Sequence, residues 1–457
     1  MTERSMIIGH RLNRFTMPTR IFGILALLLW LSCSSCASSQ AQAEERLFLP
    51  LTVEFLDEYI LPASDYDGTT VGGLSAIAYD RQQDLLYALS DDRGNFASPR
   101  FYTLRLHATE DTKSSNNLEF ASSLENGASN TEPNFVISSI DIEAVTTLTQ
   151  ENGDAFPTDT IDPEGLVLSP NRTLFIASEG VTSERLAPWV DEFDLSTGQR
   201  LRRLPIPRQY QPAAPAEAAS ENPNTSQADS SINSPPIGVQ NNKGFEALAL
   251  SASGMGVGND EPFRVFAGLE NPLIQDSDIV ATEALQPGRI IHYVVSPDRA
   301  FILAEHVYPI DPLPFGAVTT GLVELLALGP SGDFLSLERS YGLGGTRAKL
   351  FQTTFADATD TISLLRLAPN AVPASEGVLA DDSPQAWLDG IQPMRKKLVL
   401  DLYDLGITLD NLEGMTLGPR LSDGSQSLLL MSDNNFNSDE QVTQFLLFRI
   451  KGLPPML

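Results

Sequence analysis

The chain has 457 residues and a formal net charge of −29 at pH 7. A surface this acidic repels the phosphate backbone of nucleic acids, so nucleic-acid binding is excluded as a function. Its two cysteines, Cys33 and Cys36, both lie in the first 43 residues, and the histidines after them are widely spaced, which disfavours thiol chemistry, disulfides and a zinc site.

Residues 1–43 predict a signal peptide. Four arginines precede an apolar run over residues 21–31, and small residues follow up to an Ala41-Gln42-Ala43 cleavage motif. The run is shorter than the ~20 residues that a membrane-spanning helix needs, so no transmembrane anchor is expected after processing. We therefore expect an exported protein, periplasmic or extracellular. Attachment to lipid through Cys33 or Cys36 is left open as an alternative.

Residues 44–457 contain five repeats of one pattern. A short apolar run, the head, carries Ser or Glu as its second residue, and after a turn a second run, the tail, ends in an acid. The second residues of the heads are Ser75, Glu164, Glu246, Glu324 and Glu413. The tails end at Asp91, Glu179, Glu270, Glu338 and Asp433. Repeated antiparallel strands without helical periodicity predict an all-β fold, a β-propeller with five recognisable blades in a single domain.

The two ends of the chain bear on how this ring closes. The last repeat runs out of residues after a third strand over residues 443–450, and the apolar segment 51–60 is expected to supply its fourth strand. A sixth blade remains an alternative, because residues 347–351 and 397–400 also have strand-like sequences.

Three segments interrupt the repeats. Residues 108–133, 211–242 and 371–392 are rich in small and polar residues and poor in large apolar ones. We predict that they are mobile surface insertions between strands and not linkers between domains.

The repeated acids are expected to meet at one end of the central channel. A head acid opens one strand and a tail acid closes its antiparallel partner, so both lie at the same end of the hairpin. Crowded carboxylates repel each other, and calcium relieves the repulsion because it accepts about six to eight oxygen ligands. The alternative is that these acids only cap strand ends. The predicted metal ligands are Asp91, Glu164, Glu179, Glu246, Glu413 and Asp433.

Basic residues are expected at the same end of the channel. Arg93 follows the first tail, Lys243 precedes the third head and Arg339 follows the fourth tail. Several cations beside an acidic metal site indicate binding of a phosphate or carboxylate ester, because arginine forks and metal ions both hold its oxygens. All three are predicted to bind substrate, and Arg93, Lys243 and Glu164 are the predicted catalytic residues.

Short motifs surround these residues. They are Leu89-Ser90-Asp91-Asp92-Arg93, Asp162-Pro163-Glu164-Gly165, Ser178-Glu179-Gly180, Lys243-Gly244-Phe245-Glu246, Leu337-Glu338-Arg339, Asp410-Asn411-Leu412-Glu413-Gly414-Met415 and Ser432-Asp433-Asn434-Asn435-Phe436. As a set they resemble the phytase-like (esterase-like activity of phytase) family, over roughly residues 51–450. The resemblance implies a propeller, ester or phosphoester hydrolysis, and calcium as a cofactor.

One main hypothesis and two alternatives follow from the sequence. The main hypothesis is an exported, monomeric, calcium-dependent hydrolase of a small phosphoester that acts at the acidic mouth of the channel. The first alternative is a non-catalytic propeller that is stabilised by calcium and binds a ligand or partner. The second is a hydrolase of lactones or carboxylic esters.

Overall fold

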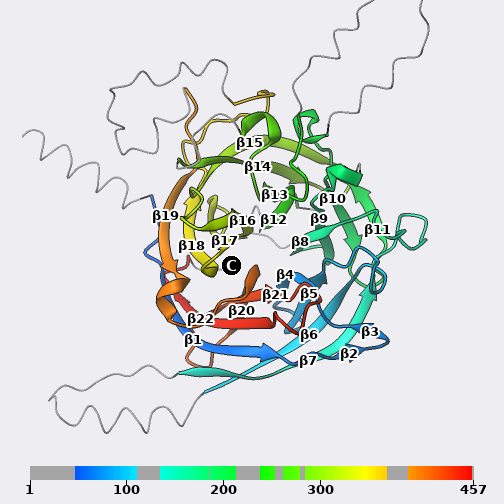
Figure 1. Ribbon diagram of the computed structural model, residues 1–457, viewed down its shortest axis with the longest axis vertical. Helices are drawn as coiled ribbons and strands as arrows, with labels where there is room; N and C mark the ends of the chain where they lie inside the picture. The colour runs from blue at the N-terminus through cyan, green and yellow to red at the C-terminus, as the bar shows by residue number, and fades with distance from the viewer. Residues whose placement is uncertain are drawn as a thin grey trace, which may run out of the picture. The chain divides into compact units, whose positions relative to one another are not determined.

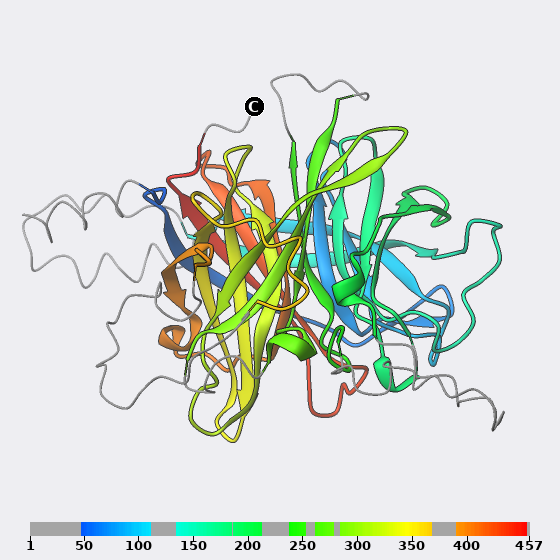
Figure 2. The same ribbon diagram turned by 90° about the horizontal axis from the view of Figure 1, so that it is seen from above.

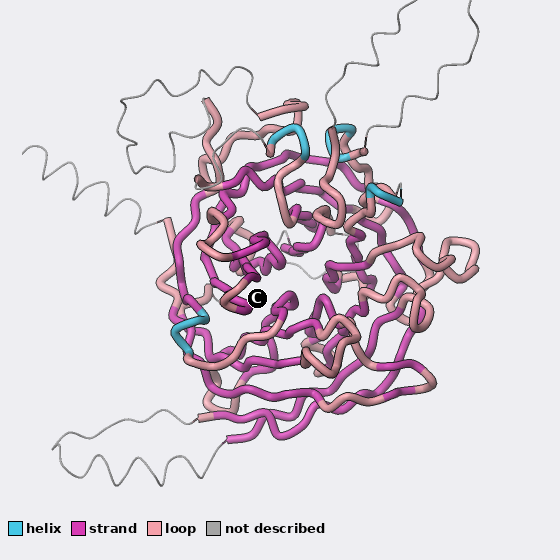
Figure 3. Tube along the Cα trace, viewed as in Figure 1, coloured by secondary structure: helices cyan, strands magenta, loops and turns pink. Residues whose placement is uncertain are grey.

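Five four-stranded antiparallel sheets are arranged around a central channel in the computed structural model of this chain (Figure 1). The structure describes residues 47–110, 134–184, 186–212, 237–252, 261–277, 284–367 and 390–454. Strands dominate these residues, and the few helices are short single turns (Figure 3). The fold is a five-bladed β-propeller, as the repeats predicted.

Each blade is a meander that runs from the channel outward, except that blade 5 takes its outermost strand from the start of the chain. Blade 1 contains β4 (Leu74–Asp80), β5 (Leu85–Ser90), β6 (Arg100–Glu110) and β7 (Phe135–Thr147). Blade 2 contains β8 (Pro163–Leu168), β9 (Thr173–Ser178), β10 (Trp189–Asp194) and β11 (Arg200–Arg203). Blade 3 contains β12 (Phe245–Ala252), β13 (Phe263–Leu269), β14 (Gln286–Val295) and β15 (Ala300–Ile310). Blade 4 contains β16 (Ala317–Ala327), β17 (Asp333–Gly342), β18 (Gly345–Thr354) and β19 (Arg395–Asp401). Blade 5 contains β20 (Asn411–Arg420), β21 (Gln426–Asp433), β22 (Thr443–Lys451) and β1 (Thr52–Leu61), and a small hairpin of β2 (Asp65–Tyr66) and β3 (Thr69–Thr70) follows β1.

The ring is closed by β1, which pairs with β22 along its whole length, from Thr52 opposite Lys451 to Leu61 opposite Thr443. This confirms the predicted closure by the N-terminal strand. The sixth blade is not formed: residues 347–351 lie in β18 and residues 397–400 in β19, so both belong to blade 4. Closure covers the apolar blade faces that an open array would expose at its two ends.

The hydrophobic core is divided into layers between neighbouring blades. Leu86 of β5 and Leu429 of β21 belong to a layer between blades 1 and 5, and corresponding layers lie between the other blade pairs. Both faces of each inner strand are therefore covered, which explains why the heads and tails are nearly continuous apolar runs instead of alternating ones.

Several predictions fall outside the described residues. The leader over residues 1–43 does so entirely, and so do most of the three predicted insertions. Residues 108–110 differ from the prediction because they extend β6. Among the helices of the described chain, none has the length and apolar character needed to cross a membrane.

Candidate functional site

A β-bulge occurs at the same place in all five inner hairpins. At this place each inner strand has a residue that is skipped in the pairing with the second strand; we call this the bulge position. The residue just before each bulge position pairs with a residue of the second strand. The next residue along that second strand is called the tail position. A bulge re-aims its side chain out of the regular alternation, and bulges are common beside active sites. The bulge positions are Ser75, Glu164, Glu246, Val323 and Glu413, and the tail positions are Asp91, Glu179, Glu270, Arg339 and Asp433.

Blade 4 differs by one residue from the register that the sequence predicted. Its last pair before the bulge is Leu322 with Glu338, so Val323 takes the bulge position and Arg339 the tail position. A shift of one residue turns a side chain to the opposite face of a strand. The expectation that Glu324 and Glu338 join the acidic ring is therefore wrong.

Both displaced glutamates have structural partners. Glu324 Oε1 accepts hydrogen bonds from the backbone N–H of Leu325 at 2.8 Å and of Leu248 in blade 3 at 3.2 Å. The carboxylate of Glu338 accepts hydrogen bonds from the Tyr308 hydroxyl at 2.7 Å and from Lys396 Nζ at 2.6 Å. These contacts hold neighbouring strands together, so neither acid contributes to the channel mouth.

The other repeated acids gather around a cavity of about 860 Å³ at one end of the channel. Nine acidic residues and three basic ones line it within the described part of the chain. The three basic residues are those predicted from the sequence, Arg93, Lys243 and Arg339. Five of the six predicted metal ligands also line this cavity, namely Asp91, Glu164, Glu246, Glu413 and Asp433.

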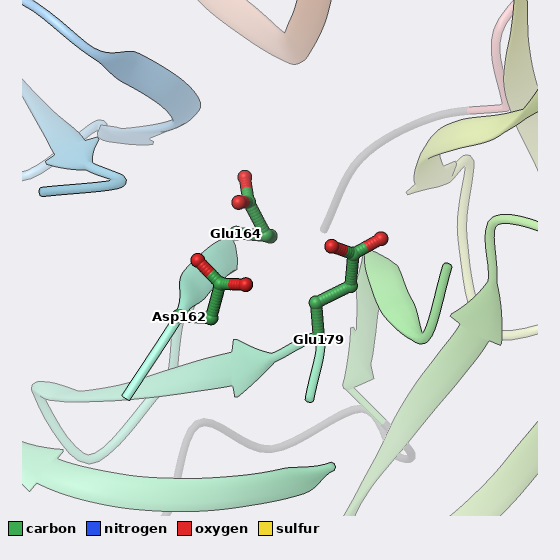
Figure 4. A group of neighbouring side chains, drawn as sticks. All are labelled: Asp162, Glu164 and Glu179. Carbon is green, nitrogen blue, oxygen red and sulfur yellow. The ribbon is translucent and has the colours of Figure 1, made fainter. Parts of the chain in front are cut away.

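The sixth predicted ligand, Glu179, joins two groups of acids. In one group, Asp162, Glu164 and Glu179 each place a carboxylate oxygen within 4.8 Å of the others (Figure 4). In the second group, Glu179, Glu246 and Glu270 meet the same distance limit. Figure 4 shows the first group: Asp162 precedes β8, Glu164 lies on it and Glu179 follows β9. Asp162 and Glu164 are brought this close because only one residue separates them, at the start of β8.

The second group lies beside two basic side chains, although Glu246 Oε2 has no hydrogen-bond partner among the described residues. Lys243 Nζ lies 2.6 and 2.8 Å from the two carboxylate oxygens of Glu270, and Arg339 Nη2 lies 3.7 Å from the same carboxylate. Arg339 also donates to Glu413. Charge pairs of this kind reduce the need for a bound cation on that side of the cavity.

In the first group, Asp162 Oδ1 lies 3.8 Å from Arg93 Nε. Glu179 is 1% exposed, and its Oε1 has no hydrogen-bond partner among the described residues. Burying a carboxylate oxygen without a partner is costly, so this oxygen indicates a site for a cation.

The electrostatics reflect this crowding. Burial, together with repulsion from Asp162, raises the pKa of Glu164 well above its usual value. Burial and Glu270 have the same effect on the pKa of Glu179. Burial and the neighbouring Glu413 raise the pKa of Asp433 to about 8. Without a bound cation, burial and mutual repulsion therefore favour the protonated form of these carboxyl groups.

Two ligand candidates were missed by the sequence reasoning. Asp162 and Asn411 occupy equivalent positions, two residues before the bulge acids Glu164 and Glu413, and both line the cavity. Asn411 contacts Glu413 through a 2.9 Å hydrogen bond from its amide. The recurrence of polar residues two positions before a head acid was the signal that could have identified them.

The fold and the site together define a five-bladed β-propeller with an acidic, partly compensated cavity at one end of its channel. The chain belongs to the phytase-like family, described as "esterase-like activity of phytase", whose model matches residues 69–436. No curated protein matches the sequence.

Several solved propeller structures are similar to this chain in fold. The N-terminal domain of Nup159 has 9% sequence identity and a TM-score of 0.30, with 88% of this chain and 95% of that chain covered. The Pan2 WD40 domain of Neurospora crassa has 7% identity and a TM-score of 0.29, with 89% and 96% covered. The Dos1 propeller has 7% identity and a TM-score of 0.27, with 82% and 68% covered. Similarity at this level carries no information about activity.

Proposed function

We propose that this protein is a calcium-dependent hydrolase of phosphoesters that acts in the acidic cavity. The observation that carries the proposal is the buried carboxylate of Glu179, whose Oε1 has no hydrogen-bond partner in the described chain and which faces Asp162 and Glu164. Family membership supports a hydrolase-type propeller. Calcium and the phosphoester substrate are the parts that go beyond the family.

The donor set fits calcium. The cavity offers carboxylate and amide oxygens, and calcium takes about six to eight oxygen ligands with loose geometry. We assign Asp162, Glu164 and Glu179 as the central ligands, with Asp91, Glu246, Glu413 and Asp433 around them. Calcium, when bound, supplies Lewis-acid polarisation of an ester oxygen.

The side chains of the cavity have separate tasks in this proposal. Arg93 lies beside Asp162, and in this proposal its half-buried guanidinium binds the oxygens of a phosphate group. Lys243 and Arg339 hold Glu270 and Glu413 in place and add positive charge beside them. Glu164 is assigned the proton transfer, because burial raises its pKa.

A calcium titration tests the proposal. Purified protein freed of metal with a chelator is expected to bind calcium in calorimetry and to hydrolyse p-nitrophenyl phosphate only when calcium is present. Glu179→Gln keeps the shape of the side chain and removes its charge, so calcium affinity and rate should both fall at least about tenfold. Glu151→Gln is the matched control, because Glu151 is an exposed acid outside the cavity.

Other outcomes separate the alternatives. Hydrolysis of p-nitrophenyl acetate but not of the phosphate would indicate a carboxylic ester or lactone as substrate. A calcium-dependent rise in melting temperature without turnover of either ester would indicate a binding propeller. Failure to bind calcium would refute the metal site.

The setting in which the protein acts is part of the proposal. The basic and apolar leader over residues 1–43 supports export to the periplasm or beyond, where calcium is abundant enough to fill a site of moderate affinity. We propose that the processed protein acts as a monomer, and its mass in sedimentation velocity tests this directly.

A further inference from the structure

Blade 4 is longer than the other blades on the side of the cavity. Its inner strand β16 begins at Ala317, six residues before the bulge position, whereas β4, β8, β12 and β20 begin one or two residues before theirs. Its second strand β17 continues for four residues past Glu338, which at ~3.3 Å per residue adds about 13 Å. In Figure 2 the yellow hairpin of β17 and β18 accordingly reaches beyond the other coloured loops at the lower edge.

The tip of this extension is apolar and exposed. Phe315 and Leu343 are fully exposed, at 109% and 96%, and Val318 is 76% exposed. Phe315 and Leu343 are neighbours, because the N–H of Leu343 donates to the carbonyl of Gly316 at 3.0 Å. Single exposed apolar residues are ordinary, but a group on a projecting tip marks an interaction site.

The extension is also one wall of the acidic cavity. Thr319 and Tyr341, on its paired strands, line the cavity, and so do Gly345 and Thr346 at the start of β18. A second exposed aromatic residue, Phe96, stands near the cavity next to blade 5, where its ring stacks on Phe436 at 4.3 Å. Phe436 directly follows Asn435, which lines the cavity.

We propose that this apolar tip, Phe315, Val318 and Leu343, together with the exposed Phe96, seats the cavity mouth on an electrically neutral lipid surface. A narrow hairpin tip with fully exposed side chains suits insertion between lipid head groups, where the gain scales with the apolar area buried. The acidic lining of the mouth repels anionic lipids, which selects neutral ones. If the protein is the hydrolase proposed above, its substrate is then an ester carried by an amphiphile at that surface; this step rests on the proposed function.

Vesicle flotation tests the docking. Protein purified in its processed form should float with vesicles of pure phosphatidylcholine, in chelator as well as in calcium, because the tip contains no proposed metal ligand. The double substitution Phe315→Ser with Leu343→Ser should lower the bound fraction at least about tenfold. Adding anionic phosphatidylglycerol to the vesicles should weaken the binding of the unaltered protein.

The matched control is the double substitution Phe301→Ser with Leu303→Ser, because these residues form an equally apolar exposed pair on β15, at 53% and 55% exposure. Equal loss of flotation in the control, or no flotation of the unaltered protein, would refute the proposal. The proposal would also be refuted if sedimentation velocity showed a dimer that the tip substitutions convert to a monomer, because the apolar tip would then bind a second copy of the chain. Flotation that persists when Glu179→Gln abolishes calcium binding would show that docking stands even if the metal site is altered.

Discussion

Gly73 shows how little room the cavity leaves around its acids. Its backbone has φ of +59°, and a Cβ atom there would lie 2.0 Å from Asp91 Oδ1 and 2.2 Å from Cε2 of Phe436. Side chains other than glycine are strained at positive φ, and these two contacts would add a collision. The carboxylate of Asp91 can therefore occupy its position only because residue 73 is a glycine.

We therefore predict that Gly73→Ala lowers both stability and calcium affinity. The backbone strain should cost about 1 kcal/mol in the free energy of unfolding, and the displaced Asp91 should weaken calcium binding several-fold. Gly68→Ala is the control, since Gly68 also has positive φ, of +78°, but nothing lies within 4 Å of its Cβ site. Denaturant unfolding and calorimetry measure the two effects, and equal calcium affinity in both variants would remove Asp91 from the site.

At the scale of strands, the register of one hairpin decides which charge reaches the cavity. In blade 4, one register would put Glu324 at the bulge position and Glu338 at the tail position. The observed register is shifted by one residue and puts Val323 and Arg339 there instead. Hydrophobic pattern and turns predicted five blades and the closing strand, because both depend on apolar runs buried between blades. The bulge that fixes the register has no comparable sequence signal, and the partner of Glu338, Lys396, comes from a distant strand.

Glu324 gives a prediction at this scale, because its carboxylate ties the inner strand of blade 4 to that of blade 3 through Leu248. Glu324→Ala leaves buried N–H groups without an acceptor and should lower the free energy of unfolding by about 2 kcal/mol. Glu324→Gln retains an acceptor oxygen and should cost less. Calcium affinity should be unchanged in both, and a loss of affinity in the glutamine variant would return Glu324 to the metal site.

For the whole molecule, the buried carboxyl groups of the cavity make the free energy of unfolding depend on both pH and calcium. Carboxyl groups with raised pKa values hold protons in the folded state that the unfolded chain has already released, so each stabilises the fold less as pH rises through its folded pKa. Asp433, with a pKa of about 8, titrates this way near neutral pH. His292 acts in the opposite direction, since burial lowers its pKa to about 4, but its effect is confined to pH values below its ordinary pKa of 6.5.

The window from pH 6.5 to 8.5 therefore isolates the carboxyl groups. In chelator the free energy of unfolding should fall there by up to about 1.4 kcal/mol per pH unit for each proton released, and the melting temperature should fall with it. Calcium binds the ionised carboxylates, so its stabilising effect should be larger at pH 8 than at pH 6.5, and the slope should flatten. Asp433→Asn, which cannot ionise, should reduce the slope in chelator. A melting temperature in chelator that rises across this window would mean that these acids are ionised without a metal, and that Arg93, Lys243 and Arg339 alone balance the cavity.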